Sequence, residues 1–181
     1  AQYVPIQLLD VQGTWENQHN ADEIEKVIAI LSEFDVPKKS VPKVMIATLN
    51  VTQRTKIIRA IEQAKQDSKF RKHIEPLEEA GLNVKNLENL QGDECDVLII
   101  SVGYGKTPTG RFSRSYGAIN QKHGYRLLNV LITRSRHKVI VLNSIPAEAH
   151  SLFEHELAAG SQGTWSRGLL HAYIQYAQAI S

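Results

Sequence analysis

The chain has a single cysteine and no long apolar run. Cys95 is the one cysteine among 181 residues, which excludes an internal disulfide framework and a zinc site built from several cysteines. No apolar stretch approaches the ~20 residues that a membrane-spanning helix needs. The first ten residues, AQYVPIQLLD, have neither the basic start nor the apolar core of a signal peptide. We therefore expect a cytoplasmic protein without a membrane partner.

Acidic residues are missing from one long stretch of the chain. Between Asp96 and Glu148 there is no Asp or Glu, and the same stretch carries eight basic residues, Lys106, Arg111, Arg114, Lys122, Arg126, Arg134, Arg136 and Lys138. The rest of the chain holds 13 basic and 19 acidic residues. A basic part of this kind attracts polyanions such as nucleic acids, although a solvated basic face without a function has the same composition. The missing carboxylates argue against a nuclease or nucleotidyltransferase that holds Mg²⁺ there.

Strand-like apolar runs alternate with segments of helical periodicity. The runs are IQLLDV (6–11), VMIATL (44–49), VLIISV (97–102) and VIVLNS (139–144). Asn20 is a good N-cap for a helix over 21–34, and Thr52 is a possible start for a second helix. This alternation predicts an α/β fold, a parallel sheet with helices on both faces, and such sheets bind ligands at the carboxyl ends of their strands.

Two further segments complete this prediction. Residues 164–181 are expected to form a helix that packs on the sheet through Leu169, Leu170, Tyr173, Ile174 and either Tyr176 or Ala177. We assign residues 1–160 to one domain and 161–181 to a C-terminal helical appendage. Residues 103–124 form a long loop without apolar periodicity, and loops of this length are usually functional or mobile.

The sequence GYGKT (103–107) imitates a phosphate-binding loop but lacks its requirements. The full loop needs a glycine where this chain has Ile100, and it must open a helix, whereas Pro108, Thr109 and Gly110 follow here. We therefore expect no P-loop at this position. We also predict no metal site among the chain's own residues.

Three polar segments lie at the ends of predicted strands or helices. They are TLNVTQR (48–54), QGDECD (91–96) and YRLLNVLITRSR (125–136). Read as a helix, the third has a continuous apolar face, and Arg134 falls on its boundary with the polar face. An arginine in that position has a buried stem and a guanidinium directed along the surface, which suits a phosphate contact. A plain amphipathic helix with a solvated basic face fits the same pattern.

These segments resemble motifs of superfamily 1 helicases. The strings NLENLQGDECDVLIISVGYG and RLLNVLITRSRHKVIVLNS are similar to motifs V and VI of the branch that includes the nonsense-mediated-decay RNA helicase and large bacterial AAA-type helicases. KVMIATLNVTQRTKII resembles motif IV, and LLDVQGTWENQHNADEIEKV resembles the segment that opens the same domain. The resemblance covers residues 6 to 145 and implies the second RecA-like motor domain, a P-loop NTPase-type fold without the P-loop.

The resemblance also implies roles for individual residues. Arg54 and Arg134 correspond to the arginines that reach the γ-phosphate of ATP across the interdomain cleft. The implied nucleotide contacts are Gln53, Gly92, Glu94 and Arg126. The implied contacts to single-stranded DNA or RNA are Thr48, Gln91, Thr133 and, in the basic loop, Arg111 and Arg114. ATP and Mg²⁺ are then bound mainly by the first RecA-like domain of the same chain.

Two departures from the family pattern weaken parts of this assignment. Thr48-Leu49-Asn50 stands where the branch has a Thr-Pro-aromatic triplet, and Arg126-Leu127 stands where motif VI opens with two arginines. A basic α/β module that binds a single strand without ATP is the alternative to an ATP-dependent helicase domain. The helicase role predicts that Arg54 and Arg134 present their guanidinium groups on the same side of the domain, at the carboxyl ends of the strands.

Overall fold

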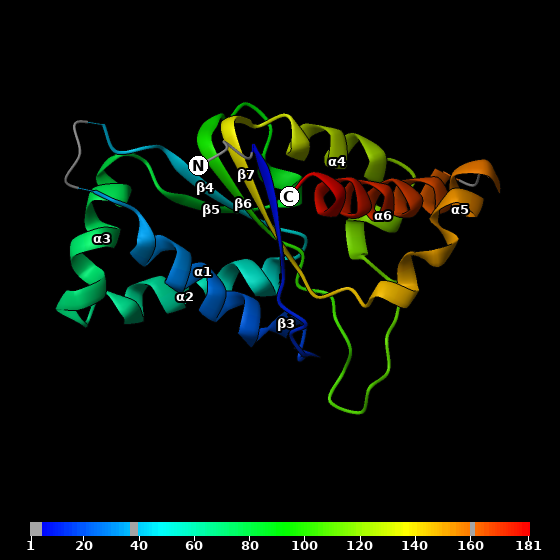
Figure 1. Cartoon of the computed structure of the whole chain (residues 1–181), viewed down its shortest axis with the longest axis horizontal. Coiled ribbons are helices and arrows are strands. Elements are labelled where there is room, and N and C mark those ends of the chain that lie inside the picture. The colour runs from blue at the N-terminus through cyan, green and yellow to red at the C-terminus, as the bar shows by residue number, and fades with distance from the viewer. Residues whose placement is uncertain (1–4, 37–39, 160–161) are drawn as a thin grey trace.

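The centre of the domain is a five-stranded, fully parallel sheet (Figure 1). The computed structural model describes residues 5–36, 40–159 and 162–181. The strands lie in the order β1 (Ile6–Asp10), β7 (Ser135–Asn143), β6 (Cys95–Ser101), β4 (Val44–Thr48) and β5 (Asn83–Asn86). A short antiparallel pair, β2 (Trp15–Glu16) and β3 (His19–Asn20), follows β1. The predicted parallel α/β sheet is confirmed, and each of the four apolar runs lies in one of its strands.

Helices cover both faces of the sheet (Figure 1). One face carries α1 (Ala21–Glu33), α2 (Val51–Ala64) and α3 (Ser68–Glu79). The other carries α4 (Gly124–Ile132), α6 (Gln162–Ile180) and the short 3-10 helices η1 (Leu87–Asn89) and η2 (Gly117–Asn120). The 3-10 helix η3 (Ala147–Leu152) and α5 (Phe153–Ala159) lead into α6. Because side chains alternate along a strand, Ile46 faces the first layer and Met45 the second.

Asparagine side chains begin the first two helices. The Asn20 side chain accepts a hydrogen bond from the Glu23 backbone N–H at 3.1 Å, which confirms the predicted N-cap of α1. The predicted start at Thr52 is wrong. Asn50 caps α2 by accepting from the Gln53 N–H at 2.7 Å. The carboxamide of Asn50 directly follows β4 and satisfies a free donor of the first turn.

Helix α4 is shorter than its sequence pattern indicates. It ends at Ile132, and Ser135 already pairs with Cys95 at the start of β7. The helical reading of residues 134–136 is therefore wrong, because strand pairing with β6 competes successfully for these residues. Arg134 lies in the short connection between α4 and β7.

The C-terminal helix packs on the sheet layer through α4, η2 and β1. Leu170, Ile174 and Ala177 are buried, whereas Tyr176 is 56% exposed, so Ala177 is the residue that faces the body. The predicted domain boundary between residues 160 and 161 lies outside the described residues. Among the helices that the structure describes, none is both long and apolar enough to cross a membrane.

Candidate functional site

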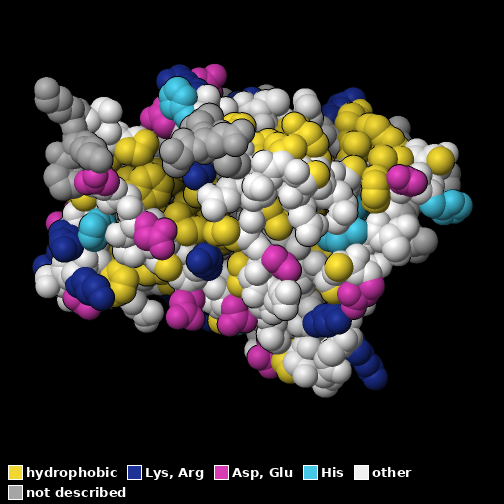
Figure 2. All heavy atoms as spheres, in the orientation of Figure 1, with side chains coloured by type: hydrophobic (Ala, Val, Ile, Leu, Met, Phe, Trp, Pro, Cys, Tyr) yellow, Lys and Arg dark blue, Asp and Glu magenta, His cyan; other side chains and the backbone are white. Residues whose placement is uncertain are grey.

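The ends of the 103–124 segment are packed into the core. Tyr104 and Tyr116 are buried with ring centroids 5.2 Å apart, and Trp15 lies 4.7 Å from Tyr104. The part in between projects from the body (Figure 1), and Figure 2 shows Lys and Arg side chains along one side of this projection, with acidic side chains close to them. Arg111 is exposed there. The sequence does not indicate that these two tyrosines pack together in the core, because the residues between them are mostly polar and have no regular apolar period.

The glycines of the GYGKT sequence permit close packing of the backbone. A Cβ atom on Gly105 would lie 2.4 Å from the Gly13 carbonyl oxygen, so no side chain fits there. Gly103 has φ +81°, a backbone conformation that favours glycine. No helix starts between residues 103 and 116. This segment therefore lacks the helix N-terminus on which a P-loop holds its phosphates.

Arg114 points into the domain and does not offer its charge to a ligand. Its guanidinium forms an ion pair with Glu156, which is also held by Arg167 with an Nε–Oε1 distance of 2.7 Å. Glu156 is buried in α5, and a buried carboxylate needs such partners. Arg114 therefore has a structural role in the domain and its nucleic-acid contact stays a prediction, whereas Arg111 is exposed.

Thr48 and Gln53 are buried structural residues. The Thr48 hydroxyl donates to the Asn50 carbonyl at 2.7 Å, and Thr48 has no exposed surface. The Gln53 amide donates to Ser101 Oγ at 3.0 Å and to the Asn20 carbonyl at 3.2 Å, and it accepts from the Asn20 N–H at 2.8 Å. These bonds occupy the polar atoms of both side chains. The predicted strand contact at Thr48 and nucleotide contact at Gln53 therefore do not fit the structure.

Gln53 belongs to a buried polar network around Glu23, which the sequence reasoning did not identify. Glu23 has no exposed surface, and its carboxylate accepts from Ser101 Oγ at 2.6 Å, Gly103 N at 2.8 Å and Ser144 Oγ at 2.7 Å. Burial raises the pKa of this carboxyl to about 7, against the effect of its hydrogen bonds. The network joins the carboxyl ends of β6 and β7 to the first turn of α1.

A polar hollow of about 360 Å³ lies at the amino ends of β4, β6 and β7. We call it the amino-end hollow, and it is lined by Lys43, Gly92, Asp93, Glu94, Cys95, Asp96, Arg134 and Arg136. Gly92 has φ +86°, so the turn before β6 needs glycine. Gln91 is exposed in the same turn. The hollow thus gathers the predicted residues Gly92, Glu94 and Arg134.

Arg134 is held at the amino-end hollow by neutral acceptors. Its Nε donates to the Val130 carbonyl at 2.9 Å, Nη1 to the Asp93 carbonyl at 3.2 Å and Nη2 to Thr133 Oγ1 at 3.2 Å. Thr133 itself is anchored by donating to the Asn129 and Val130 carbonyls. The guanidinium is oriented by these three acceptors, and no ion pair between Arg134 and a carboxylate is found among the described residues.

The acidic residues of the hollow all have partners. Lys85 pairs with Asp93, and Arg136 donates to Glu94 Oε2 at 2.7 Å. These hydrogen bonds lower the pKa of both carboxyls. Asp96 Oδ2 accepts from the Lys43 backbone N–H at 2.8 Å. No group of three or more His, Cys, Asp or Glu residues suited to a metal occurs in the described parts of the chain.

Arg54 and Arg134 do not meet at the carboxyl ends of the strands. Arg134 lies at the amino ends, because it precedes β7, and that part of the prediction is wrong. Arg54 in the first turn of α2 donates from Nε to the Val84 carbonyl of β5 at 3.1 Å. Lys85, the next residue, pairs with Asp93, whose carbonyl accepts from Arg134. A short series of contacts along the β5 edge therefore connects the two arginines.

Arg126 is remote from the amino-end hollow. It is exposed in the first turn of α4, where its Nε donates to the Tyr125 hydroxyl at 3.0 Å. Arg134 follows the other end of this helix, and the six residues from Arg126 to Ile132 at ~1.5 Å each span about 9 Å along the axis. The predicted grouping of Arg126 with Glu94 around one nucleotide is therefore not supported by the structure.

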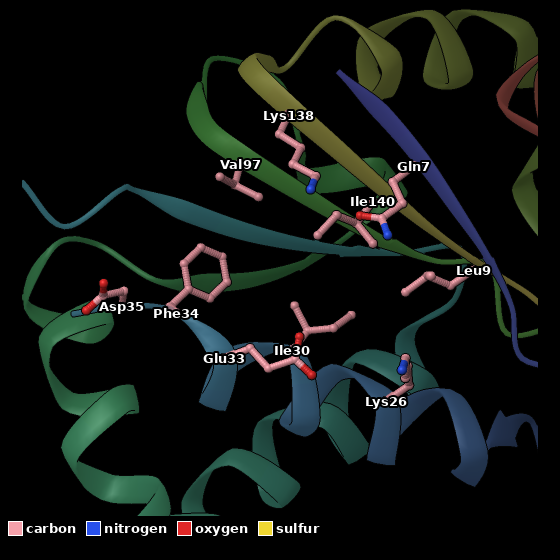
Figure 3. Close-up of a pocket in the computed structure, with 10 residues that line it drawn as sticks. All are labelled: Gln7, Leu9, Lys26, Ile30, Glu33, Phe34, Asp35, Val97, Lys138 and Ile140. Atoms are coloured by element: carbon pink, nitrogen blue, oxygen red, sulfur yellow. The ribbon is translucent and has the colours of Figure 1, made fainter. Parts of the chain in front are cut away.

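A second hollow, of about 380 Å³, lies between α1 and the strands β1 and β7 (Figure 3). Its walls combine apolar side chains such as Ile30 and Ile140 with charges of both signs, including Lys138 and Glu33. None of the predicted site residues lines it. The amino-end hollow is therefore the better candidate for the functional site.

Comparison with known proteins relates the chain to helicases. Residues 4–145 match a family model described as an AAA domain. The chain is 28% identical over 174 residues to the uncharacterized ATP-dependent helicase MG140 of Mycoplasma genitalium and, equally, to its homolog of Mycoplasma pneumoniae. Each match covers 94% of this chain, and the chain spans about 15% of the length of either relative.

Proposed function

Because the chain belongs to this AAA domain family of superfamily 1-type helicases, we propose that it is the second RecA-like motor domain of an ATP-dependent nucleic-acid helicase. In this role it completes an ATP site whose P-loop and Mg²⁺-binding residues belong to the first motor domain. We propose single-stranded DNA or RNA as the second ligand. The chain itself contributes cations to the nucleotide and part of the groove for the strand.

The observation that carries the proposal is the state of Arg134. Its guanidinium is fixed by three neutral acceptors at 2.9 to 3.2 Å and borders the amino-end hollow. Hydrolysis of ATP transfers the γ-phosphoryl group to water, and negative charge on its oxygens must be stabilised in the transition state. A preoriented arginine without a carboxylate partner supplies that charge without first breaking an ion pair.

Arg54 supports the same role at the edge of β5. Its Nε is occupied by the Val84 carbonyl at 3.1 Å, whereas no carboxylate contact of its guanidinium is found among the described residues. Closure of a first motor domain against this edge would bring the γ-phosphate to both arginines. Glu94 is a nucleotide contact in this proposal, and it would exchange Arg136 for a polar group of the nucleotide.

The strand would lie at the opposite end of the sheet. The tip between β6 and η2 carries the exposed Arg111 and Lys106, whose Nζ lies 2.8 Å from the exposed Glu148. Backbone phosphates bind such exposed cations, and nearby aromatic rings can stack with bases. A binding module without ATPase activity would use this tip alone and would have no use for a preoriented Arg134.

The test is ATP turnover of the helicase that contains this domain. We expect Arg134→Ala to lower kcat by roughly 10³-fold, as for other arginines that act across a domain interface. Arg134→Lys keeps the charge but loses the fork, and we expect it to restore little of the rate. Arg59→Ala, an exposed arginine on α2, is the matched control. Turnover of Arg134→Ala equal to that of Arg59→Ala would contradict the proposal.

A further inference from the structure

We propose that Lys43 is a second phosphate-binding residue of the amino-end hollow and acts together with Arg134 on a nucleoside triphosphate or an inorganic polyphosphate. This inference rests on the proposed function and adds Lys43, the first residue of the motif IV-like segment, to which the resemblance assigns no role. Lys43 precedes β4, whereas Arg134 precedes β7. The two cations therefore approach the hollow from different strands.

The backbone of Lys43 is fixed by both of its hydrogen-bonding groups. Its N–H donates to Asp96 Oδ2 at 2.8 Å. Its carbonyl accepts from the N–H groups of Asp96 at 2.8 Å and Val97 at 3.2 Å. The side chain passes close to Gly81, where an added Cβ would lie 3.5 Å from Lys43 Cε. The side chain thus starts from a rigid backbone, and Lys43 is one of the residues that line the hollow.

The distribution of ion pairs leaves Lys43 and Arg134 available to an anion. Asp93 forms an ion pair with Lys85, and Glu94 forms an ion pair with Arg136. No ion pair of Lys43 is found among the described residues, and the same holds for Arg134. After the direct hydrogen bonds from Lys85 and Arg136, the charge of Lys43 also helps to lower the pKa of Asp93 and Glu94. Its ammonium therefore acts on the hollow itself.

Lysine and arginine would contribute differently to the same polyphosphate. The Arg134 guanidinium is a planar fork with a fixed orientation, whereas the Lys43 ammonium is a compact charge on a flexible stem. The stem allows the ammonium to follow an oxygen that moves as the phosphoryl group is transferred. Both are charge-assisted contacts, which are stronger than neutral hydrogen bonds.

Inorganic tripolyphosphate is the probe, titrated into the 181-residue chain at low salt. The readouts are the NMR shifts of Arg134 Nε and the Gly92 amide, which report on the hollow, together with calorimetry for Kd. We expect saturable binding in the unmodified chain. A charge-assisted contact is worth about 1.4 kcal/mol or more, so Lys43→Gln is expected to weaken binding about tenfold. Lys43→Gln retains most of the stem, and Lys43→Met serves as the second variant.

Two further variants separate this inference from the proposed function. Lys72→Ala removes an equal charge from an exposed position on α3 and is expected to leave Kd nearly unchanged. Arg134→Ala is expected to weaken binding as much as Lys43→Gln does. If Arg134→Ala weakens binding and both Lys43 variants do not, the inference is overturned while the proposed function stands. If the NMR shifts of Arg134 and Gly92 do not saturate with tripolyphosphate, the inference about Lys43 is overturned. Equal Kd values for all variants contradict both the inference about Lys43 and the proposed function of Arg134.

Discussion

Arg114 and Arg134 are chemically identical side chains in the same basic stretch, yet their partners assign them different roles. Arg114 is paired with the buried Glu156, whereas Arg134 contacts only neutral acceptors. A paired arginine stabilises the fold, and an unpaired, oriented one is ready for a ligand. The charge of a residue in the sequence therefore does not decide whether a ligand can use it.

Replacement of Arg114 should lower the stability of the domain rather than its affinity for single-stranded nucleic acid. Arg114→Ala leaves the buried Glu156 with Arg167 alone, and we expect a loss of about 2 to 3 kcal/mol in the free energy of unfolding, since breaking a fully buried pair costs about 3 to 5 kcal/mol. Arg111→Ala at the exposed tip should change the free energy of unfolding by less than about 0.5 kcal/mol. Urea denaturation of both variants measures the difference, and equal losses would contradict the assignment.

Glu23 should make the stability of the domain depend on pH. Its folded pKa of about 7 lies above the ordinary value of 4.5, so the folded state binds more protons than the unfolded state between these values. The free energy of unfolding then falls as pH rises through this window, by at most about 1.4 kcal/mol per pH unit. Below pH 4.5 and above pH 7 this contribution is constant.

Urea denaturation between pH 5 and pH 8 tests the role of Glu23 by comparison with a neutral isostere. Glu23→Gln cannot ionise, so its stability relative to the unmodified chain should rise with pH across the window. Glu25→Gln, at an exposed position of the same helix, should show no such trend. Parallel pH profiles for Glu23→Gln and the unmodified chain would exclude a titrating Glu23.

At the scale of elements, side-chain hydrogen bonds determine where α2 begins and strand pairing determines where α4 ends. Asn50 caps α2 with a 2.7 Å bond to the Gln53 N–H, and Thr52 follows inside the first turn. Both residue types are good caps, so the sequence alone leaves two starts. The end of α4 is decided by Ser135, which pairs with Cys95 of β6. A helical wheel contains no information about that partner.

The cap of α2 predicts that two similar substitutions lower the stability of the domain by different amounts. Asn50→Ala removes the acceptor for the Gln53 N–H and is expected to destabilise the domain by about 1 kcal/mol. Thr52→Ala loses only a 3.3 Å contact with Gln18 and should cost less than about 0.5 kcal/mol. Thermal unfolding of the two variants compares them directly, and a larger loss for Thr52→Ala would contradict the cap at Asn50.

At the scale of the whole molecule, the sheet separates two regions with different chemistry. The amino ends carry the hollow with Arg134 and Lys43, and the carboxyl ends carry the Glu23 network and the basic tip. This separation suits a motor domain that contacts a nucleotide at one end and a strand at the other. Among the described residues, neither region has a group of three or more His, Cys, Asp or Glu residues suited to a metal.

The isolated chain is therefore expected to have no ATPase activity above background. The GYGKT sequence does not form a P-loop, since Gly105 packs against Gly13 and no helix follows within residues 103–116. Phosphate release at saturating ATP, Mg²⁺ and single-stranded nucleic acid measures this. Turnover that disappears in Arg134→Ala would show that the chain carries a complete active site and would refute the expectation.

The sequence by itself determined the parallel α/β sheet, because four apolar runs separated by helical segments can bury their side chains in few other ways. It also determined the helicase-like segments, which are local strings of residues. Helix α3 and strand β5 escaped prediction, because α3 contains Pro76 and β5 reads NVKN, a short edge strand with little apolar content.

Only the tertiary structure decided which polar and charged side chains are available to a ligand. Structural hydrogen bonds occupy the side chains of Arg114, Thr48 and Gln53, and their partners lie 2 to 48 positions away in the sequence. Lys43 lines the amino-end hollow together with Glu94, although it lies 51 positions before Glu94 in the sequence. Hydrogen bonds and ion pairs of this kind depend on which strands become neighbours. Sheet order is set by packing of the whole chain, so the same residue types make structural contacts at one end of a strand and line the amino-end hollow at the other.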